Sequence, residues 1–228
     1  MRKWTLLLFF TVALGELLAD VIKSAELHLI CKPMIMITLG IYYLINTSNH
    51  RSTLVLLAIL FSFVGDTALM FESSESLFFM LGLGAFLISH VFYILAYRQH
   101  QYQRIGDALH GIRKIRFAFP IVLAGTGLIV ILYPTLGALK FPVMVYALVL
   151  VLMVLNGLFR YGRTTNKSFW MVFGGAVLFM VSDSLLAIDK FLQSIAHPGL
   201  LIMSTYISAQ FLIVEGLSSH ANTSENNS

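Results

Sequence analysis

Two aspartates, Asp66 and Asp183, lie inside apolar stretches of the sequence where charged residues are rare. An ionisable group inside such a stretch is costly to bury, so it usually faces other protein groups and has a function. Two carboxyl groups that meet in one cavity can share a proton, so that one acts as a general acid while the other stays ionised. We therefore predict Asp66 and Asp183 as catalytic residues. The alternative is that each aspartate only forms hydrogen bonds with neighbouring helices.

Further polar side chains in the apolar stretches are candidates for binding a substrate. Tyr206 and Gln210 are four residues apart and so share one helix face. Lys32 directly precedes Pro33 at the predicted start of a helix, where its ammonium group would either meet a phosphate or reach towards the membrane surface. A lone histidine in a helix, such as His90, is more often a hydrogen-bonded core residue. The candidate substrate-binding residues are Lys32, Ser62, Ser182, Tyr206, Gln210, His90 and Tyr93.

The sequence lacks several motifs that mark other kinds of enzyme. It has no G-x-S-x-G nucleophile motif, no H-E-x-x-H zinc motif and no G-x-x-x-x-G-K-[ST] phosphate-binding loop. No histidines and cysteines have the spacing of metal ligands, and Cys31 is the single cysteine. We therefore predict neither a metal nor a cofactor, and the available chemistry is that of carboxyl, phenol, amide and ammonium groups.

The composition indicates which elements hold these residues. Of 228 residues, 58% are hydrophobic and 11% are charged, whereas soluble domains have about 25% charged residues. Apolar runs of the length that crosses a bilayer occupy residues 4–22, 30–46, 52–71, 76–97, 117–133, 141–160, 169–189 and 198–218. Since lipid cannot satisfy an open strand edge, these runs predict an all-α integral membrane protein with a bundle of eight transmembrane helices. Residues 1–217 form a single predicted domain, and the polar tail 218–228 is predicted to be disordered.

The distribution of lysine and arginine predicts the orientation of the bundle. With a cytoplasmic N-terminus, eleven basic residues lie in the inner segments: Arg2, Lys3, Arg51, Arg98, Arg104, Arg113, Lys114, Arg116, Arg160, Arg163 and Lys167. Four lie in the outer segments: Lys23, Lys32, Lys140 and Lys190. This bias predicts that both termini are cytoplasmic. Asp66 and Asp183 then lie at similar depths near the outer surface, about 8 Å from the ends of their helices.

A weak internal repeat relates the two halves of the chain. The stretch Phe63-Val64-Gly65-Asp66-Thr67-Ala68-Leu69 resembles Met180-Val181-Ser182-Asp183-Ser184-Leu185-Leu186, and Pro33-Met34-Ile35-Met36 resembles Pro142-Val143-Met144-Val145. The paired stretches are four spans apart and run in the same direction, which favours two parallel four-helix repeats.

Five motifs, in order, resemble those of the YhhN-like lysoplasmalogenase family. They are Lys32-Pro33, Phe61-Ser62-x-x-Gly65-Asp66-x-x-Leu69-Met70, Gly82-x-x-x-Phe86-x-x-x-His90-x-x-Tyr93, Phe179-x-x-Ser182-Asp183-Ser184-Leu185-Leu186-Ala187-x-x-Lys190-Phe191 and Tyr206-x-x-Ala209-Gln210-x-Leu212-Ile213. The resemblance implies a membrane hydrolase that cleaves the vinyl ether bond of lysoplasmenyl-ethanolamine or lysoplasmenyl-choline, giving a fatty aldehyde and a glycerophospho-base. Acid catalysis would come from the Asp66 and Asp183 pair.

The expected partners are a lysophospholipid substrate, water and membrane lipid, with no nucleic acid. The protein would lie in the inner membrane of a bacterium or in the endoplasmic reticulum of a eukaryote. The main alternative is a proton-coupled transporter of a small molecule or lipid, because intramembrane carboxylates and repeats suit that class too. A structural or lipid-binding membrane protein is a third possibility, in which the aspartates only hold helices together.

Overall fold

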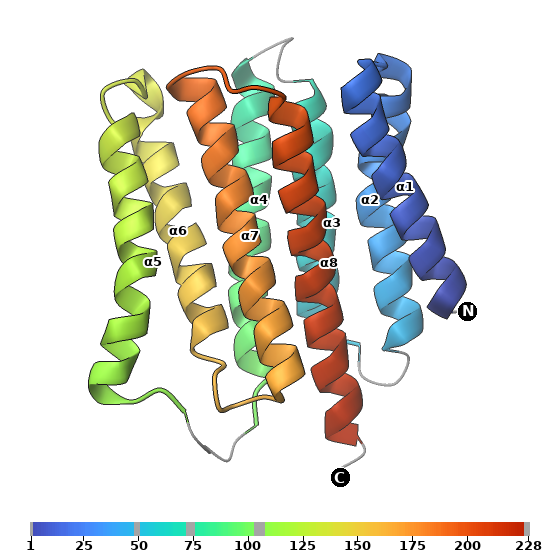
Figure 1. Ribbon diagram of the computed structural model, residues 1–228, viewed down its shortest axis with the longest axis vertical. Coiled ribbons are helices and arrows are strands. Elements are labelled where there is room, and N and C mark those ends of the chain that lie inside the picture. The colour runs from blue at the N-terminus through green and yellow to red at the C-terminus, as the bar shows by residue number, and fades with distance from the viewer. Residues whose placement is uncertain (1, 48–50, 72–75, 103–107, 226–228) are drawn as a thin grey trace. The chain divides into compact units, whose positions relative to one another are not determined.

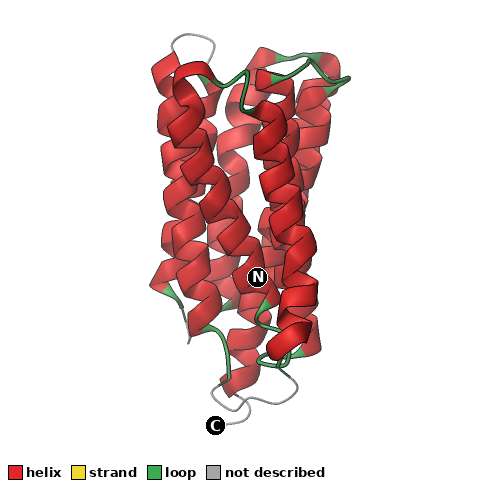
Figure 2. Ribbon diagram, turned by 90° about the vertical axis from the view of Figure 1, so that its left-hand side faces the viewer, coloured by secondary structure: helices red, strands yellow, loops and turns green. Residues whose placement is uncertain are grey.

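The computed structural model describes residues 2–47, 51–71, 76–102 and 108–225. These residues form eight α-helices and one 3-10 turn, with no strand among them (Figure 2). The helices are α1 Arg2–Ile22, α2 Ala25–Asn46, α3 Thr53–Met70, α4 Ser76–Gln99, α5 Gly111–Leu132, α6 Lys140–Leu158, α7 Asn166–Phe191 and α8 Pro198–Glu225, with the 3-10 turn η1 at Gly137–Leu139. All eight are long and apolar enough to cross a membrane. The predicted all-α fold with eight spans is therefore confirmed.

Many large apolar side chains of these helices point away from other protein groups. Trp4, Val130 and Phe141 are each more than two-thirds exposed, at 75%, 71% and 77%. A soluble monomer rarely exposes so many large apolar side chains together, whereas lipid covers them without cost. The chain is a multi-pass integral membrane protein.

Several helices extend beyond the apolar runs that predicted them. α2 begins at Ala25, five residues before its apolar run, because Ser24 caps its first turn by accepting a hydrogen bond from the Leu27 amide. α5 begins at Gly111 and α7 at Asn166, and in both the added turns are polar. Hydropathy measures the span that lies in hydrocarbon, whereas hydrogen bonding continues the helix into the polar interface.

The C-terminal end of the chain also differs from the prediction. α8 continues past Ser218, where a disordered tail is predicted, and ends at Glu225. Residues 226–228 of that tail and Arg104 of the predicted inner segments lie outside the described residues.

The chain divides into two compact units, Met1–Ala96 with Ala221–Ser228 and Tyr97–His220, where a single domain is predicted. Within each unit, consecutive helices run antiparallel (Figure 1). The predicted similarity between Pro33–Met36 and Pro142–Val145 falls on α2 of the first unit and α6 of the second.

Small residues bring the helices of each unit into close contact. In the first unit, a Cβ atom at Gly82 of α4 would lie 2.7 Å from Leu69 of α3. In the second, a Cβ atom at Gly216 of α8 would lie 2.7 Å from Val172 of α7. Such approaches are typical of membrane helices, whose association depends on packing rather than on the hydrophobic effect.

Candidate functional site

Asp183 is held by a tyrosine from the preceding helix. The Tyr146 hydroxyl group on α6 donates a hydrogen bond to Asp183 Oδ2 on α7, over 2.5 Å. Tyr146 is 8% exposed and Asp183 is half-buried. A phenol-to-carboxyl contact of this length is in the range of charge-assisted hydrogen bonds. It fixes the position of the carboxyl group inside the span.

The neighbours of Asp183 on α7 join that helix to α8. Ser182 Oγ donates a hydrogen bond to the Ile202 carbonyl oxygen over 3.0 Å. One turn earlier, the Phe179 ring packs edge-on against Tyr206, with 5.4 Å between ring centroids. The Gln210 side-chain amide donates to the Tyr206 hydroxyl group over 3.3 Å. The predicted shared face of Tyr206 and Gln210 is confirmed.

Asp66 lies in a tighter environment in the first unit. It is 3% exposed and sits on α3 next to Gly65, whose position would place a Cβ atom 2.6 Å from the Phe86 ring of α4. One turn earlier, Ser62 Oγ lies 2.8 Å from Ser89 Oγ, and Ser89 Oγ donates to the Ala58 carbonyl oxygen over 2.8 Å. Ser62, a predicted substrate-binding residue, thus takes part in the contact between α3 and α4.

The motif from Gly82 to Tyr93 on α4 faces α3 at two of its positions. Gly82 meets Leu69 and Phe86 meets Gly65, both on α3. Further along α4, His90 and Tyr93 are both 0% exposed. Their burial shows that both rings lie inside the protein. Their predicted role in substrate binding stays a prediction.

The two aspartates lie at different distances from the ends of their helices, where similar distances are predicted. Asp66 lies four residues before Met70, the last residue of α3, or about 6 Å along the axis. Asp183 lies eight residues before Phe191, the last residue of α7, or about 12 Å. The predicted helix end at Asp189 was wrong, because α7 continues to Phe191. The similar depth of the two aspartates in the membrane stays a prediction. Asp66 and Asp183 belong to different units, and their pairing stays a prediction.

Lys32 lies inside α2 and not at its start, which is a second correction. It is seven residues after Ala25, or about 10 Å along the helix, and half-buried. On the facing helix α1, Glu16 lies beside His28, with 2.8 Å between His28 Nδ1 and Glu16 Oε1. The acidic neighbour of Lys32 is Asp20. The misplacement follows from Ser24, whose capping starts the helix ahead of the apolar run.

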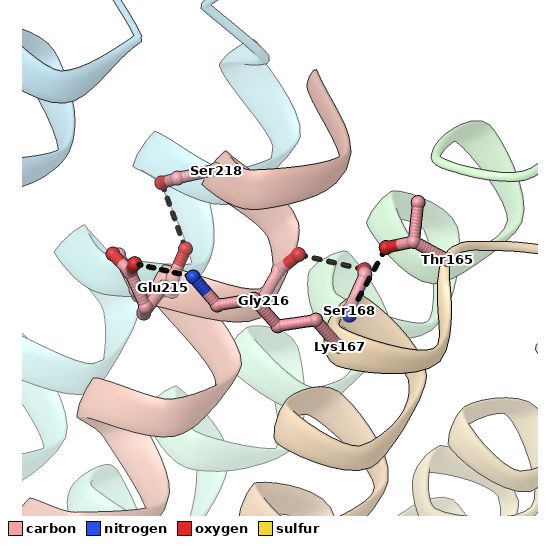
Figure 3. A network of polar contacts seen from close by, with 7 residues as sticks. Thr165, Lys167, Ser168, Glu215, Gly216 and Ser218 are labelled. Atoms are coloured by element: carbon pink, nitrogen blue, oxygen red, sulfur yellow. Dashed lines mark hydrogen bonds and ion pairs between the residues drawn. The ribbon is translucent and has the colours of Figure 1, made fainter. Parts of the chain in front are cut away.

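A second polar cluster lies at the other end of the second unit, around Ser168 (Figure 3). Ser168 Oγ donates to the Gly216 carbonyl oxygen over 2.7 Å, and the Thr165 hydroxyl group accepts from the Ser168 amide over 3.2 Å. Lys167 Nζ lies 4.0 Å from Glu215 Oε1. These contacts tie the start of α7 to α8.

Arg160 joins this cluster from the turn after α6. Its Nη2 donates to the His100 carbonyl oxygen and to Ser168 Oγ, both over 3.0 Å. It is 0% exposed, and burial lowers the pKa of its guanidinium group to about 10, while the nearby Tyr97 opposes the shift. Ser168 lies fifteen residues before Asp183 on α7, about 22 Å along the helix. Arg160 therefore links the turn after α6 to the start of α7, and it lies far from the Asp183 carboxyl group.

The sequence prediction missed Tyr146 and Arg160. Tyr146 follows the repeated Pro142–Val145 stretch directly, but an aromatic residue in a span carries no signal of its own. Arg160 was assigned to an inner segment, where basic residues are common. Among the described residues, no group of three or more histidine, cysteine or acidic side chains has an arrangement that fits a metal ion.

Fold and site together define a polytopic helical membrane protein with carboxyl groups held inside its spans. Residues 27–217 match the YhhN family, and the chain belongs to it. The chain is 31% identical over 183 residues to lysoplasmalogenase TMEM86B of Homo sapiens, covering 80% of this chain and 71% of that one. It is 28% identical over 192 residues to lysoplasmalogenase TMEM86A of Bos taurus, covering 82% and 73%.

A bacterial relative shows a similar level of identity over a shorter region. Lysoplasmalogenase of Mycobacterium tuberculosis is 32% identical over 140 residues, covering 60% of this chain and 50% of that one. No solved structure matches this fold. With relatives named as hydrolytic enzymes across most of its length, the chain is a membrane hydrolase.

Proposed function

We propose that this enzyme hydrolyses the vinyl ether bond of lysoplasmalogens, releasing a fatty aldehyde and a glycerophospho-base. The relatives named lysoplasmalogenase support the substrate class. The observation that carries the chemistry is the 2.5 Å hydrogen bond from Tyr146 to Asp183, which sets a carboxyl group in a defined position inside a span. Vinyl ethers react with acid and need no metal or nucleophilic side chain.

Hydrolysis begins with transfer of a proton to the vinyl carbon β to the ether oxygen. The product is an oxocarbenium ion, whose positive charge needs a nearby anion. Water adds to the carbon attached to oxygen and loses its proton to a carboxylate, giving a hemiacetal. The hemiacetal then breaks its carbon–oxygen bond to the glycerol, yielding the aldehyde and the free alcohol. One acid, one anion and one water suffice.

We assign the role of proton donor to Asp66 and the role of anion to Asp183. The phenol of Tyr146 donates to Asp183, and a donated hydrogen bond favours the ionised form of a carboxyl group as its acceptor. Asp66 is more deeply buried, at 3% exposed, and burial disfavours a charge. The environments of the two groups therefore favour opposite protonation states, which is the usual basis for separating an acid from a base.

The remaining predicted residues take supporting roles in this scheme. Tyr206 and Gln210, joined by their own hydrogen bond, are placed to orient water or the glycerol of the substrate. The ammonium group of Lys32 would hold the phosphate, as a point charge suited to that anion. Ser182 and Ser62 contribute through the contacts that fix the helices beside each aspartate.

The test is aldehyde release from lysoplasmenyl-ethanolamine by purified protein in detergent, without any ion gradient. We expect turnover by the wild type and a loss of at least a hundredfold in Asp66→Asn and Asp183→Asn, since general acid–base catalysis contributes about 10²–10⁴-fold. The double variant should lose little more than either single variant, because groups acting in one step are not additive.

Asp189→Asn is the matched control for these variants. Asp189 lies on the same helix as Asp183, and its Oδ1 accepts a hydrogen bond from the Ile195 amide over 2.9 Å, at the helix end. This variant should keep its activity. Well-folded Asp66→Asn or Asp183→Asn protein with full activity would refute the proposal, as would uptake of lipid into sealed vesicles with no product formed.

A further inference from the structure

The first unit contains a cluster of ionisable side chains on α1 and α2, of which the proposed function above uses only Lys32. We define it as the hairpin cluster: Glu16 and Asp20 on α1, and His28 and Lys32 on α2. Residues four apart share a face of a helix, so each helix presents its pair on one face. His28 Nδ1 lies 2.8 Å from Glu16 Oε1, and the electrostatic neighbours of Asp20 are Glu16, His28 and Lys32. The four groups therefore form one unit.

The hairpin cluster is short of positive charge and of hydrogen-bond donors. It holds two carboxyl groups against one permanent cation, Lys32, because His28 is charged only when protonated. Glu16 is 0% exposed, and no aligned hydrogen bond from any described residue reaches either of its carboxyl oxygens or Asp20 Oδ2. Buried carboxyl oxygens are normally paired. Apart from the contact between Glu16 Oε1 and His28, the carboxyl oxygens of the cluster can therefore still accept hydrogen bonds from a cationic donor.

The position of the hairpin cluster fits the head group of a membrane lipid. α1 ends, α2 begins and α3 ends at the same end of the first unit, because consecutive helices run antiparallel (Figure 1). Glu16 lies six residues before the end of α1, about 9 Å, and Asp66 lies about 6 Å before the end of α3. The cluster therefore lies at a depth close to that of the proposed acid, in the region where polar head groups meet the hydrocarbon.

We propose that the hairpin cluster binds the head group of the substrate, with Lys32 at the phosphate and Asp20 and Glu16 at a primary ammonium group. This inference rests on the proposed function and adds a preference for ethanolamine over choline. A primary ammonium group can donate hydrogen bonds to the carboxyl oxygens of the cluster. A quaternary ammonium group has no such hydrogen to donate and is typically bound by aromatic rings. Residues 11–33, which form the hairpin, contain no phenylalanine, tyrosine or tryptophan.

The acidic half of the hairpin cluster lies outside the region shared with the family. The family match begins at residue 27, so it includes His28 and Lys32 but neither Glu16 nor Asp20. A phosphate is common to all lysophospholipids, while the base varies. In this proposal the cation that binds the phosphate lies inside the family match, and the carboxyl groups that recognise the base lie before it.

The experiment compares kcat/KM for lysoplasmenyl-ethanolamine and lysoplasmenyl-choline in the wild type, Asp20→Asn and Glu26→Gln. The wild type should prefer ethanolamine. Asp20→Asn should lower kcat/KM for ethanolamine about tenfold and change that for choline less than twofold, since a hydrogen bond to a charged group contributes about 1.5 kcal/mol or more. Glu26→Gln removes an exposed acid from the same hairpin and should change neither value. Lys32→Met should lower kcat/KM for both substrates by the same factor.

A preference for choline in the wild type, or an equal effect of Asp20→Asn on both substrates, would overturn the head-group assignment and leave the hydrolase intact. Loss of the proposed function looks different, because the wild type would then release aldehyde from neither substrate. In that case the melting temperature in detergent decides. The site is supported if glycerophosphoethanolamine raises the melting temperature of the wild type more than glycerophosphocholine does, and if Asp20→Asn shows no such difference. Equal effects of the two compounds on the wild type refute the site.

Discussion

The surroundings of Asp66 and of Asp183 differ more than their similar sequences imply. Asp183 receives a hydrogen bond from Tyr146 and is half-buried, whereas Asp66 is 3% exposed and lies between close helix contacts. Aligning Pro33 with Pro142 places Ile37 where the second unit has Tyr146, and Ile37 is 42% exposed. The first unit therefore has no phenol at the equivalent place. A repeated motif can thus supply two carboxyl groups with different chemistry.

The largest expected effect of this difference is on the pH dependence of activity. If Asp66 is the acid, the wild-type rate falls at high pH, where the donor is ionised, and falls at low pH, where the anion is protonated. The residual activity of Asp66→Asn should lose the fall at high pH, and that of Asp183→Asn the fall at low pH. The measurement is kcat/KM against pH for both variants. Exchange of the two patterns would reverse the roles, and identical patterns would remove the distinction.

A smaller effect is expected from Tyr146→Phe, which removes the hydrogen bond and keeps the ring. We expect kcat to fall about tenfold, the loss of one hydrogen bond to a charged group. The fall in rate at low pH should move to higher pH, because the Asp183 carboxylate then protonates more readily. The measurement is the pH profile of kcat beside that of the wild type.

Tyr43→Phe is the matched control in the first unit. The Tyr43 hydroxyl group is also buried, but it accepts from the Ser52 amide over 2.9 Å, at the end of α2. Its loss should lower stability by about 1–3 kcal/mol, the cost of an unsatisfied buried donor, without moving the pH profile. An unchanged profile in Tyr146→Phe would show that this phenol only packs.

The sequence was sufficient for the fold because hydropathy reports directly on the lipid environment. Eight apolar runs predicted eight helices, and the four-residue spacing of Tyr206 and Gln210 predicted their shared helix face. Helix ends were predicted less well, since Ser24 starts α2 through a hydrogen bond and not through hydropathy. The predicted position of Lys32 at the start of α2 was wrong for this reason.

The partners of each candidate residue could not be predicted from one sequence. Tyr146 and Asp183 come from helices whose relative rotation depends on packing, and a tyrosine in a span is otherwise unremarkable. Glu16 of α1 lies beside His28, in the first turn of α2, a contact between two helices that the sequence did not predict. Such contacts depend on which faces of two helices meet, which hydropathy does not encode.

The smallest expected effect is on stability, and it concerns Gly65 on the helix of Asp66 and Gly175 on the helix of Asp183. A Cβ atom at Gly175 of α7 would lie 2.8 Å from the Ala209 carbonyl oxygen and 3.0 Å from the Ile213 amide nitrogen, both in the backbone of α8. Since backbone cannot rotate away, Gly175→Ala must separate the two helices. At Gly65 the obstacle is the ring of Phe86, a side chain that can turn. We expect Gly175→Ala to cost about 1–3 kcal/mol, the usual range for overpacking, and Gly65→Ala less.

Gly174→Ala provides the reference, because a Cβ atom there meets nothing within 4 Å. On the same helix, this change should be neutral or stabilise the protein by up to about 1 kcal/mol, since alanine favours a helix over glycine. The measurement is thermal unfolding of the three variants in one detergent. A larger loss of stability in Gly65→Ala than in Gly175→Ala would mean that the Phe86 ring is fixed in place. The surroundings of Asp66 would then be more rigid than those of Asp183. A rigid site suits a proton donor, because the donor must stay pointed at one atom of the substrate.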